Sequence, residues 1–234
     1  MEPQKSTARL AGLLYLIVVV TGFFSLAYVP TQLMVPGNIA STIQNLSTST
    51  TLFRLGIYAG MLCYATFVLL PLVLYKLLQA VNKYYAVAMV ALALVSVPLS
   101  LMAVAEKFAI LTLLGDGAYS TALSTEALQA QVAWRLDQYS NIISITSIFW
   151  GLWLFPFGYL VFRSRFLPGI LGIFLMAGCF GYLLNFTGGF LFPAAYDTLG
   201  ISGYVSIPSA LGEIGTCLWL LIVGVKKRTL APVV

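Results

Sequence analysis

The chain has 234 residues, of which 60% are hydrophobic and 8% are charged, and its formal net charge is +5. Soluble domains carry about 25% charged residues, so this composition excludes a soluble domain. It indicates one integral membrane domain over residues 1–234. The positive charge follows the membrane topology set out below, and we expect no nucleic-acid partner.

Basic residues mark where the chain turns on one side of the membrane. Nine of the twelve Lys and Arg residues fall in four short clusters, separated by enough apolar chain to cross a bilayer twice. Short cytoplasmic loops retain basic residues, so this spacing predicts six spans, a cell-membrane location and both termini in the cytoplasm. The clusters are Lys5/Arg9, Lys76/Lys83, Arg163/Arg165 and Lys226/Lys227/Arg228.

The apolar runs place the six predicted spans, in chain order, at about residues 8–29, 52–78, 85–114, 131–162, 168–192 and 208–225. Runs of this length suit the ~30 Å hydrocarbon core of a bilayer. The first run is too long for the apolar part of a cleaved signal peptide, so we expect it to remain. Proline should end the first span at Pro30, kink the second at Pro71 and open the fifth at Pro168.

The loops on the two sides of the predicted membrane differ. The turn at residues 79–84 is short and basic, whereas the opposite loops, 31–50, 115–130 and 193–207, are longer and polar. In the first of these, Asn38 is a candidate N-cap for a helix with an apolar face, which we expect to lie at the membrane interface. The predicted fold is therefore all-α: a six-helix transmembrane bundle with a short interfacial helix in the first outer loop.

The residue types that bind metals and haem are scarce. The chain has no His and three Cys, and Cys63, Cys179 and Cys217 lie in separate apolar runs. Their spacing matches no zinc or redox motif, and each is interpreted as a small hydrophobic residue. We therefore expect no cofactor, no metal site and no disulfide.

Glu213 is the charged residue predicted to lie deepest in the membrane. It precedes Lys226 by 13 residues. At about 1.5 Å per helical residue, it lies roughly 20 Å from the inner boundary. A carboxylate at that depth needs a partner, and we expect it to pair with Arg54 or Arg135.

Other polar residues extend this candidate site. Asp137 and Asn141 share a face of the fourth span, and Arg54 and Tyr58 share one of the second. We expect them to line one outward-facing polar cavity, and we assign no catalytic residue. The candidate ligand-binding residues are Glu213, Arg54, Arg135, Asp137, Asn141, Asn185 and Tyr58.

A structural interpretation of the same residues stays open, because polar pairs can also hold helices together. Lys107 follows Glu106 directly in the sequence. It could form a Schiff base if it were desolvated, but the neighbouring acid favours an ordinary ammonium.

Several segments resemble an uncharacterised prokaryotic membrane family, the domain of unknown function numbered 4386. They are ARLAGLLYL at 8–16, LFRLG at 52–56, LYKLL at 74–78, VNK at 81–83 and GLWLFPFGYLVFRSRFLPGILG at 151–172. Their order along the chain is the specific part of the resemblance. Gly169 departs from the family pattern, in which a basic residue is expected after the proline. The resemblance implies a polytopic membrane protein and supplies no activity.

Three functions remain open on these observations. The polar residues and the longer outer loops favour a protein that binds, senses or transports a small amphiphilic molecule or lipid through an outward-facing cavity, with membrane lipid as its surroundings. An intramembrane enzyme using Glu213 as an acid or base is the second possibility, although no nucleophile or metal set accompanies that residue. A structural or assembly subunit of a membrane complex is the third.

Overall fold

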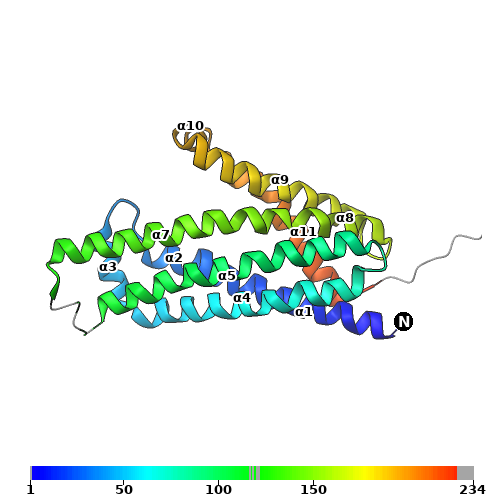
Figure 1. The fold of residues 1–234 in the computed structure, drawn as a ribbon, viewed down its shortest axis with the longest axis horizontal. Coiled ribbons are helices and arrows are strands. Elements are labelled where there is room, and N and C mark those ends of the chain that lie inside the picture. Colours follow the sequence, from blue (N-terminus) through cyan, green and yellow to red (C-terminus); the bar gives the residue numbers. More distant parts are fainter. Residues whose placement is uncertain (1, 116, 118, 120–121, 226–234) are drawn as a thin grey trace, which may run out of the picture. The chain divides into compact units, whose positions relative to one another are not determined.

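The computed structural model describes residues 2–115, 117, 119 and 122–225, and helices make up nearly all of this chain. Six of the helical segments are long and apolar enough to cross a membrane, which confirms the predicted number. Figure 1 shows the elements in order. They are α1 (Glu2–Phe23), the π-helical turn η1 (Phe24–Tyr28), α2 (Val29–Leu33), α3 (Ile39–Thr48), α4 (Thr50–Leu78), α5 (Lys83–Leu114), α7 (Thr125–Leu152), α8 (Leu154–Ser164), α9 (Gly169–Leu191), α10 (Pro193–Leu199) and α11 (Ser202–Ile222).

The chain divides into two compact units. Of the described residues, unit 1 comprises 2–16, 67–96 and 147–225, and unit 2 comprises 17–66 and those within 97–146. The division falls within α1, α4, α5 and α7, so each of these helices contributes residues to both units.

Three predicted span boundaries are wrong, because the helices extend through prolines and polar residues that were expected to lie outside them. Helical structure continues through η1 and α2 to Leu33, with Pro30 in the first turn of α2, where a missing amide hydrogen is tolerated. The fourth span begins at Thr125, because the Ser124 hydroxyl accepts a hydrogen bond from the Ala127 amide and caps α7. The sixth begins at Ser202 and runs through Pro208.

A break separates α7 from α8 at Trp153, three residues before Pro156. Proline cannot donate a backbone hydrogen bond to the fourth residue before it and clashes with that residue's carbonyl. The single long span predicted at about 131–162 corresponds to one helical segment, Thr125–Ser164, which comprises the consecutive helices α7 and α8.

The predicted helix in the first outer loop is confirmed as α3. The Asn38 Oδ1 accepts a hydrogen bond from the Ser41 amide at 2.9 Å, so Asn38 is the N-cap. Ile39, Ile43 and Leu46 follow one side of α3, and Leu46 is buried. Its position at a membrane interface stays a prediction.

The turns that carry basic residues are short. α4 ends at Leu78 and α5 begins at Lys83, where the Asn82 side chain accepts a hydrogen bond from the Tyr85 amide. Between α8 and α9, Arg165 adopts a left-handed conformation with φ of 59°. The last predicted basic cluster, Lys226/Lys227/Arg228, lies outside the described residues.

Close helix contacts at glycine hold unit 1 together. α9 packs against both α8 and α11. A Cβ atom built on Gly172 of α9 would lie 2.5 Å from the Gly158 carbonyl oxygen of α8, and one built on Gly178 would lie 2.6 Å from the Ser209 Cα of α11. Small residues at such positions let helix backbones approach closely, which is a main source of stability inside a membrane.

An aromatic cluster fills the interior of unit 1. The Trp153 ring stacks on Phe157 at 5.2 Å between ring centroids, with 8° between the planes. Phe67 contacts Trp153 edge-on, also at 5.2 Å, and Tyr15 lies 6.4 Å from it. Trp153 and Tyr15 are each 1% exposed, so this cluster is core.

Candidate functional site

Lys107 of α5 is a buried cation in unit 2. Its side chain is only 4% exposed. The Nζ atom donates a hydrogen bond to the Ser25 carbonyl oxygen of η1 at 3.4 Å, and lies 4.3 Å from the centroid of the Tyr139 ring on α7. Three elements of unit 2 therefore meet at this ammonium group.

The π-helical turn η1 helps to form this site. A π-helical turn widens a helix and is common at functional sites. η1 also lies close to α4, because a Cβ atom on Gly60 would come 2.8 Å from the Ser25 hydroxyl. The Ser25 carbonyl thus belongs to a segment that is fixed against a neighbouring helix.

Lys107 lines a hollow of about 720 Å³ in unit 2. One part of the lining comes from α2, α3 and the segment that joins them, and another part comes from α7. Both parts supply apolar side chains and polar groups. The lining residues are Pro30, Met34, Val35, Pro36, Gly37, Asn38, Ile39, Thr42, Lys107, Ala133, Leu136, Asp137, Tyr139 and Ser140.

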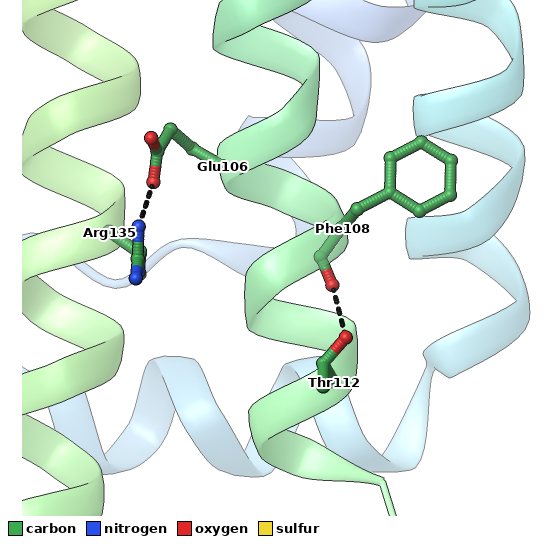
Figure 2. A network of polar contacts seen from close by, with 4 residues as sticks. All are labelled: Glu106, Phe108, Thr112 and Arg135. Carbon is green, nitrogen blue, oxygen red and sulfur yellow. Dashed lines mark hydrogen bonds and ion pairs between the residues drawn. The ribbon is translucent and has the colours of Figure 1, made fainter.

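The neighbouring acid does not neutralise Lys107. Figure 2 shows Glu106 of α5 pointing to Arg135 of α7, with Oε2 and Nη1 3.0 Å apart. In residues 2–115, 117, 119 and 122–225 this is the one ion pair within 4.0 Å. Consecutive helical residues point about 100° apart, so Glu106 and Lys107 face different neighbours.

The expectation that Arg135 pairs with Glu213 is wrong, because Arg135 pairs with Glu106. Glu213 of α11 accepts a hydrogen bond instead from the Tyr15 hydroxyl of α1, with 3.2 Å between Oη and Oε2. Tyr182 of α9 lies within electrostatic range of the same carboxylate. Glu213 thus points toward a neighbouring helix, as expected, but its partner is a neutral phenol.

We expect substitutions at Glu213 to be milder than the loss of a buried ion pair, which costs about 3–5 kcal/mol. Glu213→Leu leaves the buried Tyr15 hydroxyl without its acceptor, and it should lower the free energy of unfolding by about 1–3 kcal/mol. Glu213→Gln retains an acceptor oxygen and should cost less, whereas Tyr15→Phe leaves the Glu213 carboxyl without its donor and should also cost about 1–3 kcal/mol. Denaturation in mixed micelles measures these differences; equal losses for Leu and Gln would contradict the assigned bond.

The other predicted site residues do not share one cavity. Arg54 and Tyr58 of α4 are exposed and line a hollow of about 150 Å³ in unit 2 with Phe108. Arg135 lines a third hollow of unit 2, of about 370 Å³. Of the seven candidates, Asp137 is the one at the Lys107 hollow. Asn141 is exposed one turn further along α7 and lines none of these three hollows.

The Asn185 side chain forms hydrogen bonds that hold helices of unit 1 together. Its Nδ2 donates to the Ser206 hydroxyl at 2.9 Å and to the Ser202 carbonyl at 3.3 Å. Its Oδ1 accepts a hydrogen bond from the Tyr196 hydroxyl. These bonds tie α9 to α10 and to the start of α11, so the side-chain amide is used in packing.

The arrangement offers binding chemistry rather than a reaction. In the described ranges no group of three or more Cys, Asp or Glu side chains is placed to hold a metal ion. Tyr15 donates a hydrogen bond to Glu213, and the thiol near this pair, Cys217 of α11, is buried and donates to the Gly12 carbonyl oxygen at 3.7 Å. The buried Lys107 ammonium group, which lines a hollow, is the feature suited to binding a ligand.

Lys107 was not predicted as a site residue from the sequence, because the adjacent Glu106 was considered and not the residues that share a helix face with Lys107. Ser100, Ala103, Lys107 and Ile110 follow steps of three and four residues, and all four are buried. Such steps place side chains on one side of a helix. This row of small and apolar residues was the available signal that Lys107 faces inward.

Comparisons with known proteins identify a family of undescribed function. The family described as "Domain of unknown function (DUF4386)" matches residues 10–224. An "Uncharacterized protein" of Archaeoglobus fulgidus is 29% identical over 102 residues, which cover 42% of this chain and 54% of that protein. The chain therefore matches about half the length of this curated relative. No solved structure matches the chain.

Proposed function

The chain belongs to the DUF4386 family, and because that family is described as a domain of unknown function, we propose a function from the Lys107 hollow: this multi-pass membrane protein binds a small amphiphilic molecule or lipid there. The observation that carries the proposal is a 4% exposed lysine on the wall of a hollow of about 720 Å³. Ligand sites in proteins have about 300–1,000 Å³ and combine apolar walls with a few polar groups.

The walls of the hollow suit an amphiphile. Pro30, Met34 and Leu136 supply apolar surface, while Tyr139, Ser140 and Lys107 supply polar groups to the same lining. A molecule with an apolar chain and one polar end would satisfy both kinds of surface. Binding is the function common to sensing and transport, so it is the part of the proposal to test first.

The test fills the hollow with a tryptophan side chain and measures the binding of amphiphiles that have the same hydrocarbon chain and different polar groups. Oleate, 1-oleoyl lysophosphatidate, oleyl alcohol and oleylamine are titrated into protein in phosphatidylcholine nanodiscs. We expect at least one to bind saturably, with affinity at least tenfold lower in Ala133→Trp and in Ser140→Trp, both of which fill the hollow.

Ile145→Trp is the matched control, because Ile145 is exposed on α7 and does not line the hollow. It should bind as the unaltered protein does. Saturable binding of none of the four amphiphiles would overturn the proposal, as would an equal loss of affinity in Ile145→Trp.

An enzyme that uses Glu213 as an acid or base is the second candidate. The observation in its favour is the hydrogen bond from the Tyr15 hydroxyl to the Glu213 carboxylate at 3.2 Å, which orients the carboxylate. Turnover of an added amphiphile that is lost in Glu213→Gln while binding persists would favour this candidate.

We further propose that the termini lie in the cytoplasm and that α3 lies on the other side of a cell membrane. Gln79 in the turn after α4 and Ser47 of α3 are both exposed. In a variant whose three native cysteines are replaced, Gln79→Cys should react with a membrane-impermeant maleimide only after cells are opened. Ser47→Cys should react in intact cells, and the reverse pattern would contradict the positive-inside assignment.

A further inference from the structure

We propose that the polar end of the ligand is an anion, a carboxylate or phosphate group on an apolar chain, held by Lys107 and the first turn of α3. This inference rests on the proposed function, because it assigns the charge of the molecule that occupies the Lys107 hollow. It follows from three features of the hollow: a buried cation with no carboxylate within 4.0 Å in the described residues, a helix N-terminus and an apolar remainder.

The first feature is the missing counter-ion. The Lys107 Nζ donates a hydrogen bond to the Ser25 carbonyl oxygen and makes a cation–π contact with the Tyr139 ring, and both groups are neutral. Glu106 is engaged with Arg135, and in the described chain no carboxylate lies within 4.0 Å of Lys107. A buried charge without an opposite charge is costly, and a bound anion would supply the partner.

The second feature is the N-terminus of α3, which lies on the wall of the same hollow. Gly37, Asn38 and Ile39 line the hollow at the point where α3 begins. Asn38 caps the Ser41 amide. The first turn of a helix carries further amide groups without an acceptor inside the helix, and its dipole favours negative charge.

Asp137 is the acidic side chain on this hollow, and it sets where the anion sits. It is exposed on α7, whereas Lys107 is buried. An anion close to Asp137 would be repelled, whereas one placed between Lys107 and the first turn of α3 gains from both. The charge pattern therefore places the anionic group beside Lys107.

The experiment compares ligands that have the same chain and different charge. Oleate and 1-oleoyl lysophosphatidate carry the two anionic groups, and oleyl alcohol carries none. In phosphatidylcholine nanodiscs the unaltered protein should bind oleate or lysophosphatidate at least tenfold more tightly than oleyl alcohol. The tighter of the two anions identifies a fatty-acid or a phosphate source.

Lys107 variants test whether this residue is the cause of the preference. Lys107→Met and Lys107→Gln remove the charge and should abolish the preference for the anions, whereas Lys107→Arg should keep it. Lys83→Met is the control, because it removes an exposed positive charge from the start of the same helix. It should leave the preference unchanged.

Two results would overturn the inference while the proposed function stands. One is equal affinity of the unaltered protein for oleyl alcohol and for both anions, oleate and lysophosphatidate, with all three lost in Ala133→Trp. The other is a preference for the anions that persists in Lys107→Gln. Absence of binding for every amphiphile would instead remove the proposed function itself.

Discussion

Replacing Gly172 with valine is expected to unfold the protein or to lower its free energy of unfolding by about 3 kcal/mol or more. A Cβ atom at Gly172 would meet the Gly158 carbonyl oxygen at 2.5 Å and the Phe162 amide nitrogen at 2.6 Å. Both are backbone atoms of α8, so no side-chain rotation relieves the overlap. α8 and α9 would have to separate, and their close packing would be lost.

Gly189→Ala is the matched control for this prediction. Gly189 lies on the same helix, and a Cβ atom built there meets nothing within 4 Å. Alanine is favoured over glycine inside a helix by about 0.5–1 kcal/mol, so this variant should be as stable as the unaltered protein or slightly more so. Denaturation in mixed micelles, followed by circular dichroism, measures both variants. Equal stability of Gly172→Val and Gly189→Ala would refute the close contact.

Replacing Trp153 with alanine is expected to cost about 3–5 kcal/mol, the range found for buried aromatic residues cut back to alanine. Trp153 is 1% exposed and contacts the rings of Phe67, Phe157 and Tyr15. Within a membrane the loss is one of packing, because lipid chains are as apolar as the protein interior. The same denaturation assay measures it.

Phe155→Ala tests whether this loss depends on burial. Phe155 lies two residues away and contacts the Phe180 ring at 6.1 Å, but it is 37% exposed. Lipid can fill part of the space that Phe155 leaves, so its removal should cost less than half as much. A cost for Phe155→Ala equal to that of Trp153→Ala would show that the aromatic cluster is not the core.

The Trp153 prediction also bears on Glu213, because Tyr15 joins the aromatic cluster to that carboxylate. The Tyr15 ring contacts Trp153 and Phe157, and its hydroxyl donates to the Glu213 carboxylate. Trp153→Ala should therefore free the Tyr15 ring as well as open a cavity. The position of the acid follows from aromatic packing in unit 1.

The sequence by itself determined the number and kind of the long helices. Hydropathy and the basic clusters predicted six apolar helices, and the described chain has them. Asn38 identified the start of α3, because an N-cap acts through its own neighbouring backbone. These features depend on local chemistry, which the order of residues contains.

Local signals were weaker at the ends of helices. Pro30 and Pro208 were expected to mark boundaries, but helix continues past both. Within a bundle, neighbouring helices compensate for a proline that would interrupt an isolated helix. Ser124, which caps α7, was the signal for a start at Thr125 rather than near residue 131.

Only the tertiary structure decided the site. Periodicity states which residues share a face of a helix, but it does not state which helix that face meets. The sequence therefore predicted that Arg135 has a carboxylate partner. That this partner is Glu106 and not Glu213 followed only from the packing of α5 on α7 in unit 2. Lys107 became a candidate because η1 and Tyr139 enclose it, and these contacts join residues 82 and 32 positions apart in the chain.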